Sequence, residues 1–175
     1  MKTMSFLRRP RRSSLTFALV SALLLLACGE GMTAVTEAKQ GTKVSSFELK
    51  SLDGRKLGPQ SFAGKVVVID FWATWCAPCH VQARILEPLH KEYKARGVQF
   101  LAANVGEEEA AVRKFLEKKP LPYPVLMDPG DVSAGLGVMA LPAVIVIDKK
   151  GKVTFFQQGL ADETTLRRAL KQAGA

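Results

Sequence analysis

Short apolar runs and helical periodicities alternate along the chain after residue 44. Val66-Val67-Val68-Ile69 is a continuous β-branched run, typical of a central strand buried on both faces of a parallel sheet. Val81, Ile85 and Leu89 then recur at spacings of four and predict a helix over residues 77–96, kinked or restarted at Pro88. Further strands are predicted over residues 98–105, 122–127, 143–147 and 152–156, and further helices after Glu107 and over residues 163–172. This order of elements predicts an α/β sandwich.

An N-terminal β-hairpin is predicted ahead of the first long apolar run. Residues 47–49 and 55–57 flank Asp53-Gly54, a dipeptide typical of a tight turn between antiparallel strands. Gly58-Pro59 then interrupts the chain, and a brief helical turn is expected over residues 60–63. Because no internal repeat or low-complexity run divides them, residues 44–175 are predicted to form one domain.

The first 27 residues have the pattern of an export signal. Five basic residues and no acid precede the apolar stretch over residues 15–27, which is too short for a membrane-spanning helix. The stretch ends in Leu25-Leu26-Ala27-Cys28, which resembles the lipobox of bacterial lipoproteins and implies cleavage after Ala27 and a lipid on Cys28. Residues 28–43, without an apolar face, are expected to be a flexible tether. An uncleaved signal anchor, or ordinary secretion with Cys28 as an incidental thiol, remains an alternative.

More than half of the net positive charge of the chain lies in this signal. The chain carries 25 Lys and Arg against 16 Asp and Glu, a formal charge of +9, which alone would suggest a nucleic acid or an anionic membrane as partner. Five of the basic residues lie in the first 27, so the remainder carries only +4. We therefore expect no nucleic-acid partner.

Two of the three cysteines form the candidate chemical site, Trp75-Cys76-Ala77-Pro78-Cys79. The motif follows a strand and opens a helix, where free backbone N–H groups and the helix dipole stabilise a thiolate. Cys76, at the helix N-terminus, is therefore the candidate nucleophile, and Cys79, one turn further and expected to be buried, would resolve the mixed disulfide. Pro78 suits the first helical turn because its missing N–H would have no partner there.

Residues 66–79 resemble the thioredoxin superfamily, whose active-site signature is close to Trp72-Ala73-Thr74-Trp75-Cys76-Ala77-Pro78-Cys79. The resemblance implies a three-layer sandwich with a mixed central sheet, extended here by the N-terminal hairpin. It also implies that Pro142 is a cis-proline facing the dithiol and that the Leu141 backbone binds an extended substrate, beside Trp75, Ala77 and Pro78. Asp70 matches the buried acid of thioredoxin; its pKa should be raised, and it could exchange a proton with Cys79.

The export signal, the hairpin and Asn104-Val105-Gly106-Glu107 together resemble the TlpA/ResA-like, redoxin-type branch over residues 44–172. This implies an extracytoplasmic, lipid-anchored thiol–disulfide oxidoreductase that acts on protein disulfides, in many members apocytochrome c cysteines, and receives electrons from a membrane thiol donor. No cofactor beyond the Cys76–Cys79 disulfide, no metal and a monomeric state are expected. The chain departs from the branch in having Gln82 where a glutamate is common and Asp70 where asparagine is common.

Other functional classes share parts of this pattern. Cys76-Ala77-Pro78-Cys79-His80 also fits the attachment motif of c-type haem, which would make the protein an electron carrier. A zinc site is less well supported, because two cysteines and two scattered histidines give no recognised ligand spacing. Pro78 before Cys79, as in thioredoxin, favours a reductant, and a reductant in the oxidising periplasm needs a dedicated donor.

Overall fold

The computed structural model describes residues 38–175. The predicted signal peptide, the lipid site Cys28 and the first part of the predicted tether lie outside these residues. The described chain forms one seven-stranded sheet with the strand order β2-β1-β5-β4-β3-β6-β7. The strands are β1 (Leu49–Ser51), β2 (Lys56–Leu57), β3 (Val67–Trp72), β4 (Gln99–Val105), β5 (Val125–Asp128), β6 (Ala143–Ile147) and β7 (Val153–Gln158).

The sheet is mixed, as the resemblance implied. Strand β3 pairs in parallel with β4, and β4 pairs in parallel with β5, whereas β6 runs antiparallel to both β3 and β7. The predicted N-terminal hairpin is present, with Leu49 opposite Leu57, and it joins the sheet where β1 pairs with β5. All six residues of β3 are buried, because helices or loops cover both faces of this central strand.

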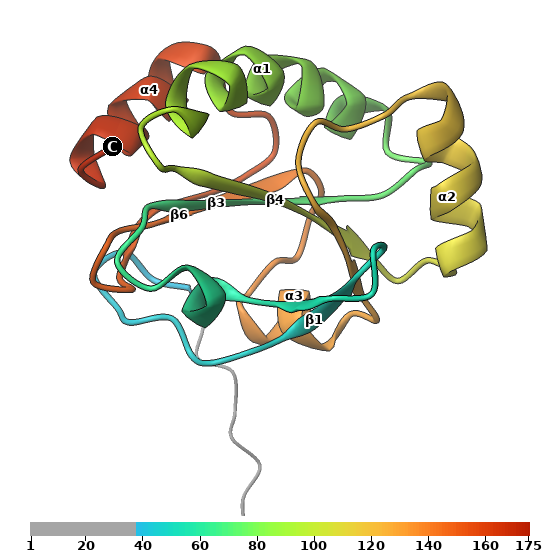
Figure 1. Ribbon diagram of the computed structural model, residues 1–175, viewed down its shortest axis with the longest axis horizontal. Helices are drawn as coiled ribbons and strands as arrows, with labels where there is room; N and C mark the ends of the chain where they lie inside the picture. Colours follow the sequence, from blue (N-terminus) through green and yellow to red (C-terminus); the bar gives the residue numbers. More distant parts are fainter. Residues whose placement is uncertain (1–37) are drawn as a thin grey trace, which may run out of the picture. The chain divides into compact units, whose positions relative to one another are not determined.

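Helices make the two outer layers of a three-layer sandwich (Figure 1). On one face, α1 (Ala77–Lys94) and α4 (Glu163–Gln172) pack over a core that includes Val68, Leu86 and Leu166. The other face buries Ile69 and Phe71 against the N-terminal segment and the short helix α3 (Asp131–Gly135). The remaining helical elements are the 3-10 turn η1 (Pro59–Phe62) and α2 (Glu109–Lys118). The predicted thioredoxin-like fold is confirmed.

Close packing also explains one glycine near the hairpin. Gly58 precedes η1, and a Cβ atom there would lie 1.9 Å from the backbone oxygen of Phe47. Such a separation is far shorter than van der Waals contact, so only glycine fits between the two segments.

Several predicted boundaries are wrong. The domain begins before residue 44, because Ala38 is buried, Gly41 N donates to Val153 O and Lys43 forms a β-bridge with Lys152. Helix α1 continues through the exposed Pro88 without a restart, whereas a kink there stays a prediction. Helix α3 was not anticipated; it is a single turn held by the Asp128 carboxylate, which accepts hydrogen bonds from three backbone N–H groups.

Candidate active site

The two cysteines lie where β3 gives way to α1. Cys76 is the N-cap residue of α1 and is joined to Cys79 by a disulfide. The Cys79 N–H lies 3.3 Å from Cys76 Sγ and also donates to Cys76 O at 3.1 Å, so a backbone donor of the first helical turn points at this sulfur. A thiolate at Cys76 in the reduced protein would be stabilised by the same donor and by the helix dipole.

Both cysteines are buried. Cys79 is 2% exposed, as predicted, but Cys76 is also buried, at 3%. The residues around them are open: Trp75 is 73% exposed, and Ala77 and Pro78 are exposed as well. These three exposed residues form a rim around the cysteines, and a protein partner would contact this rim before it reaches the disulfide.

The predicted cis peptide bond between Leu141 and Pro142 is present. It immediately precedes β6, whose first residue, Ala143, pairs with Phe71 of β3. The proline loop thus lies at the same end of the sheet as the strand that leads to Cys76. Met139, in this loop, is 84% exposed.

A side chain that the sequence did not single out holds the proline loop. The Gln158 carbonyl oxygen, from the end of β7, accepts hydrogen bonds from the backbone N–H groups of Met139 and Ala140, at 2.6 and 2.8 Å. No sequence signal distinguishes Gln158 from Gln157, which instead donates to the Leu160 carbonyl. Gln158 therefore fixes the backbone just before the residues expected to bind substrate.

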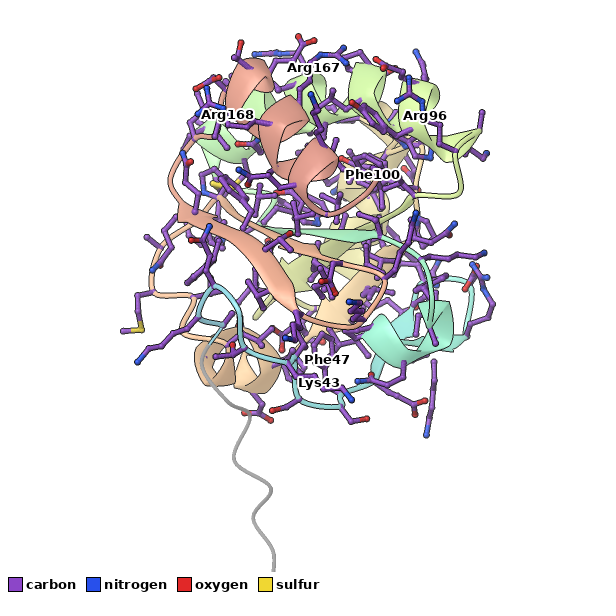
Figure 2. The ribbon with its side chains drawn as sticks, turned by 90° about the vertical axis from the view of Figure 1, so that its left-hand side faces the viewer. Lys43, Phe47, Arg96, Phe100, Arg167 and Arg168 are labelled. Carbon is purple, nitrogen blue, oxygen red and sulfur yellow. A yellow bond between two sulfur atoms is a disulfide. The ribbon has the colours of Figure 1, made fainter. Side chains whose placement is uncertain are left out.

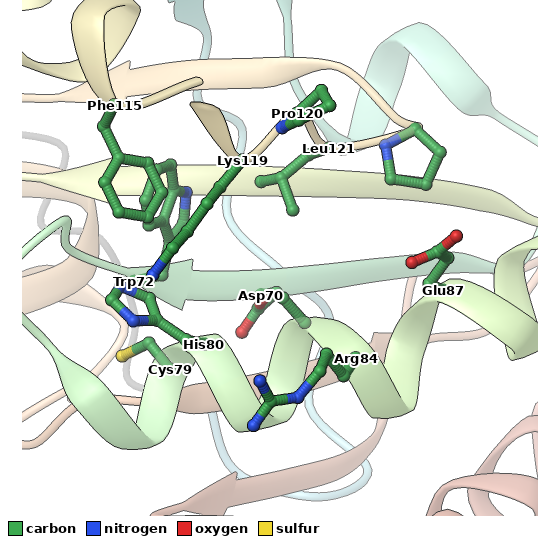
Figure 3. Close-up of a pocket in the computed structure, with 12 residues that line it drawn as sticks. Asp70, Trp72, Cys79, His80, Arg84, Glu87, Phe115, Lys119, Pro120 and Leu121 are labelled. Atoms are coloured by element: carbon green, nitrogen blue, oxygen red, sulfur yellow. The ribbon is translucent and has the colours of Figure 1, made fainter. Parts of the chain in front are cut away.

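Asp70 is buried at the floor of a cavity beside the disulfide. It is 1% exposed, its Oδ1 has no hydrogen-bond partner among residues 38–175, and desolvation raises its pKa well above the usual range. The cavity, of about 250 Å³, is lined by both Asp70 and Cys79 (Figure 3). A space of this volume next to a bare carboxyl group is large enough for several water molecules. The geometry thus fits the predicted proton exchange between Asp70 and Cys79, directly or through water.

The cavity lies between α1 and the segment from Phe115 to Pro122. Its walls combine Trp72 and Phe115, whose rings are 5.5 Å apart, with the charged side chains of Arg84 and Lys119. Trp72 Nε1 is also buried without a partner in the described chain, so the cavity presents both a donor and an acceptor to whatever fills it.

Glu107 holds the loop that carries Cys76. Its carboxylate accepts hydrogen bonds from Thr74 N at 2.6 Å, from Thr74 Oγ1 at 2.5 Å and from Asn104 Nδ2 at 2.7 Å. Partial burial opposes ionisation, but these bonds outweigh it and lower the pKa of Glu107. The sequence placed all three glutamates of the run 107–109 at a helix N-terminus. Helix α2 begins only at Glu109, so Glu107 lies before the helix. Glu107 is thus free to bind the active-site loop.

Two residues of α1 connect the site to neighbouring segments. His80 Nε2 lies 3.0 Å from the Thr74 carbonyl oxygen, and its ring is 5.0 Å from that of Phe115. Gln82 is fully buried; its amide accepts from Ala161 N at 2.8 Å and donates to Ala161 O at 3.3 Å. A glutamate at this position could accept the first bond but, when ionised, could not donate the second. Gln82 therefore ties α1 to the loop before α4.

Comparison with known proteins assigns the family. The sequence matches the Redoxin family over residues 39–172. The chain belongs to the Redoxin family. The thiol-disulfide oxidoreductase ResA of Bacillus thuringiensis is 31% identical over 171 residues, which cover 93% of this chain and 98% of the relative. ResA of Geobacillus thermodenitrificans is 33% identical over 161 residues, covering 91% and 92% of the two chains.

Solved structures agree with this assignment to the Redoxin family. A thiol:disulfide interchange protein DsbE from Chlorobium tepidum superposes with a TM-score of 0.74 at 30% identity, covering 79% of this chain and all of the other. The dsbF protein of MTB, determined in mixed oxidized and reduced forms, gives 0.66 at 28% identity, covering 73% and 94%. With its disulfide at the start of α1, this Redoxin-family protein is a thiol–disulfide oxidoreductase.

Between Ala38 and Ala175, no helix has the length and apolar character needed to cross a membrane. Within the same residues, no three His, Cys, Asp or Glu side chains come together in an arrangement that could hold a metal ion.

Proposed function

We propose that the protein reduces disulfides in exported proteins, with Cys76 as the attacking thiolate and Cys79 as the resolving thiol. The observation that carries the proposal is the pairing of the Cys76–Cys79 disulfide at a helix N-terminus with the bare, buried carboxyl group of Asp70 in the adjoining cavity. Perturbed acids beside a redox pair suit proton transfer during thiol exchange.

The reaction begins with both cysteines reduced. The Cys76 thiolate attacks one sulfur of the substrate disulfide, so that a mixed disulfide forms and one substrate thiolate leaves. Cys79 gives up its proton to the ionised carboxylate of Asp70, and its thiolate attacks Cys76 Sγ. This closes the Cys76–Cys79 bond and releases the second substrate sulfur as a thiolate, which takes up a proton from Asp70 or from water. Two electrons pass to the substrate, and a thiol donor must return two electrons to the protein before the next cycle.

The rim residues would hold the substrate during this exchange. Trp75 is the most exposed aromatic side chain beside the cysteines, and the backbone of Leu141, next to the cis bond, would pair with an extended segment of the substrate. Gln158 would act as a positioning residue, since its side chain fixes the two residues before Leu141 and takes no part in the sulfur chemistry.

The place of action is proposed to be outside the cytoplasm, with the domain held at a membrane by lipid on Cys28. The basic and apolar pattern of residues 1–27 and the lipobox resemblance support this. A Cys28→Ser variant should leave the detergent phase of a phase-separation experiment. If it stayed in the detergent phase as the wild type does, the lipid anchor would be ruled out.

Apocytochrome c cysteines are the proposed substrate, because members of the branch that this sequence resembles act on them. The haem alternative is less well supported: both sulfurs that haem would need are bonded to each other, and His80 Nε2 is engaged with Thr74 O. A visible spectrum with a Soret band that survives acid–acetone extraction would favour haem instead.

Insulin reduction in the presence of dithiothreitol tests the catalytic assignment. Cys76→Ser should abolish the acceleration that the wild type gives, because no nucleophile remains. Cys79→Ser should instead accumulate mixed disulfides with its partners, which mass spectrometry can identify. A Cys76→Ser protein as active as the wild type would overturn the proposal.

A further inference from the structure

A second cavity, of about 240 Å³, lies between the segments 43–44, 59–67 and 147–151. Four exposed lysines line it, Lys43, Lys65, Lys149 and Lys150, and Lys152 is held next to them by its β-bridge with Lys43. These five residues are named here the lysine cluster. Below them, Phe62, Val67 and Ile147 form an apolar floor.

The lysine cluster is not neutralised by the described chain. None of its five ammonium groups forms an ion pair with any residue from 38 to 175. The acid that lines the cavity, Asp148, uses Oδ1 to accept hydrogen bonds from the backbone N–H groups of Lys150 and Lys152, at 2.8 and 2.9 Å. Asp148 therefore shapes the turn that presents these lysines, and the cluster keeps a strong positive charge.

The lysine cluster and the disulfide lie at opposite ends of the central strands. Lys65 comes just before β3, and Val67 at the start of β3 pairs with Ile147 at the end of β6, so the turn 148–151 lies at the same end as Lys65. Cys76 follows the other end of β3. Six residues in extended conformation separate these ends by roughly 20 Å.

A segment near the start of the described chain lies beside the lysine cluster. Gly41 N donates to Val153 O and Val44 N donates to Gly151 O, so residues 41–44 run alongside the lysine cluster. Figure 2 shows Lys43 and Phe47 at the lower side of the domain, with Arg167 and Arg168 at the upper side. The described chain begins at Ala38, whose N–H donates to Leu136 O beside α3, so a tether formed by the preceding residues would start in the layer opposite α1 and α4.

We propose that the lysine cluster docks on an anionic lipid bilayer and so directs the disulfide away from the membrane. The proposal rests on the membrane tethering proposed above. Each lysine at an anionic surface contributes roughly a fivefold preference for the bound state, and this attraction is screened by salt. With the lysine cluster on the bilayer, Trp75 and the disulfide are presented to soluble disulfide-containing proteins.

Amine footprinting of the full chain tests this orientation. The chain is reconstituted in vesicles of phosphatidylcholine alone or with about 30% phosphatidylglycerol. Each lysine's rate of acetylation by a water-soluble reagent is then measured by mass spectrometry. Lys65, Lys149 and Lys150 should react about fivefold more slowly in the anionic vesicles, and about 0.5 M NaCl should remove the difference. Lys114 and Lys118 are exposed on α2, which follows the end of β4 on the Cys76 side of the sheet, and should react equally in both.

A matched pair of triple variants separates the lysine cluster from total charge. Lys65→Gln, Lys149→Gln and Lys150→Gln together should abolish the remaining protection of Lys43 and Lys152. Lys56→Gln, Lys114→Gln and Lys118→Gln together remove the same charge from exposed positions that form no ion pair within residues 38–175, and should preserve it. Equal labelling of the lysine cluster in the two vesicle types, or equal protection of Lys114 and Lys118, would overturn the docking proposal.

Dithiothreitol-dependent disulfide exchange in the same samples keeps the two proposals apart. If the lysine cluster is not protected but disulfide exchange is intact, only the docking proposal is contradicted. Protection of the lysine cluster with no disulfide exchange contradicts the proposed redox function alone.

Discussion

Replacing Glu107 by alanine or by glutamine tests how the active-site loop is held. The alanine variant removes all three hydrogen bonds to Thr74 and Asn104. The glutamine variant removes only the charge, since its oxygen can accept from Thr74 N and Asn104 Nδ2 while its amide donates to Thr74 Oγ1, which can act as acceptor.

The size of the effect follows from those three bonds. A net contribution of about 0.5–1.5 kcal/mol per bond, with the Thr74 and Asn104 donors left without an acceptor, predicts that Glu107→Ala lowers the free energy of unfolding by about 2–4 kcal/mol. Glu107→Gln should cost less than about 1 kcal/mol, because the contacts survive and partly exposed charges are weakly stabilising. Disulfide exchange should slow in the alanine variant, whose Thr74–Cys76 loop is no longer held, and stay close to wild type in the glutamine variant.

Urea denaturation, followed by fluorescence, measures the free energies of unfolding, and insulin reduction measures exchange. A Glu107→Ala protein within about 0.5 kcal/mol of wild type would refute the structural reasoning. Equal damage in both variants would show that charge, rather than the hydrogen-bonded geometry, is what matters.

Acid titration gives a further check with a defined sign. The pKa of Glu107 is lower in the folded protein than in the unfolded chain. Its contribution is therefore present above the unfolded pKa, about 4.3, and is lost as the pH falls through the folded pKa. The stability gap between wild type and Glu107→Gln should be present at neutral pH and close on acidification.

Three further changes test other parts of the site and the fold. Asp70→Asn should slow disulfide exchange between about pH 6 and 9. Burial raises the Asp70 pKa in the folded state, so ionisation of this carboxyl group lowers the stability of the wild type as pH rises. The variant should therefore resist urea better than wild type at pH 8 and equally well in acid. Gln158→Ala should raise KM about 5- to 30-fold with little change in kcat, whereas Gln157→Ala should leave KM unchanged in the same insulin assay. Gly58→Ala should lower the free energy of unfolding by about 1–3 kcal/mol, measured by urea denaturation, because its Cβ would overlap the Phe47 carbonyl; wild-type stability would contradict the packing described.

Local patterns predicted the elements that depend on local chemistry. The β-branched run at Val66–Ile69 became the buried central strand, and Asp53-Gly54 became the turn of the hairpin. The paired cysteines of the candidate site were recognisable because their spacing and their place at a helix start are both visible in the sequence.

Features that depend on contacts between distant segments were not predictable in this way. The Glu107 carboxylate meets Thr74 across 33 positions, and nothing in a run of three glutamates marks the first as different. Helix α3 is too short to show a hydrophobic period, and it exists because Asp128 accepts its N-terminal donors. The burial of Cys76 was not predicted, because burial is set by the surrounding loops, which a local pattern does not describe.

The segment before β1 has a consequence for solubility. Strand β7 is at one edge of the sheet, and edge strands with free backbone groups can pair with another chain. Here Gly41 N donates to the Val153 carbonyl oxygen, and Thr42 O accepts from the Val153 N–H. Gln40 Nε2 donates to the Thr154 carbonyl oxygen. The first described residues thus cap the strand edge, and shortening the protein to residue 44 would expose a template for intermolecular β-pairing.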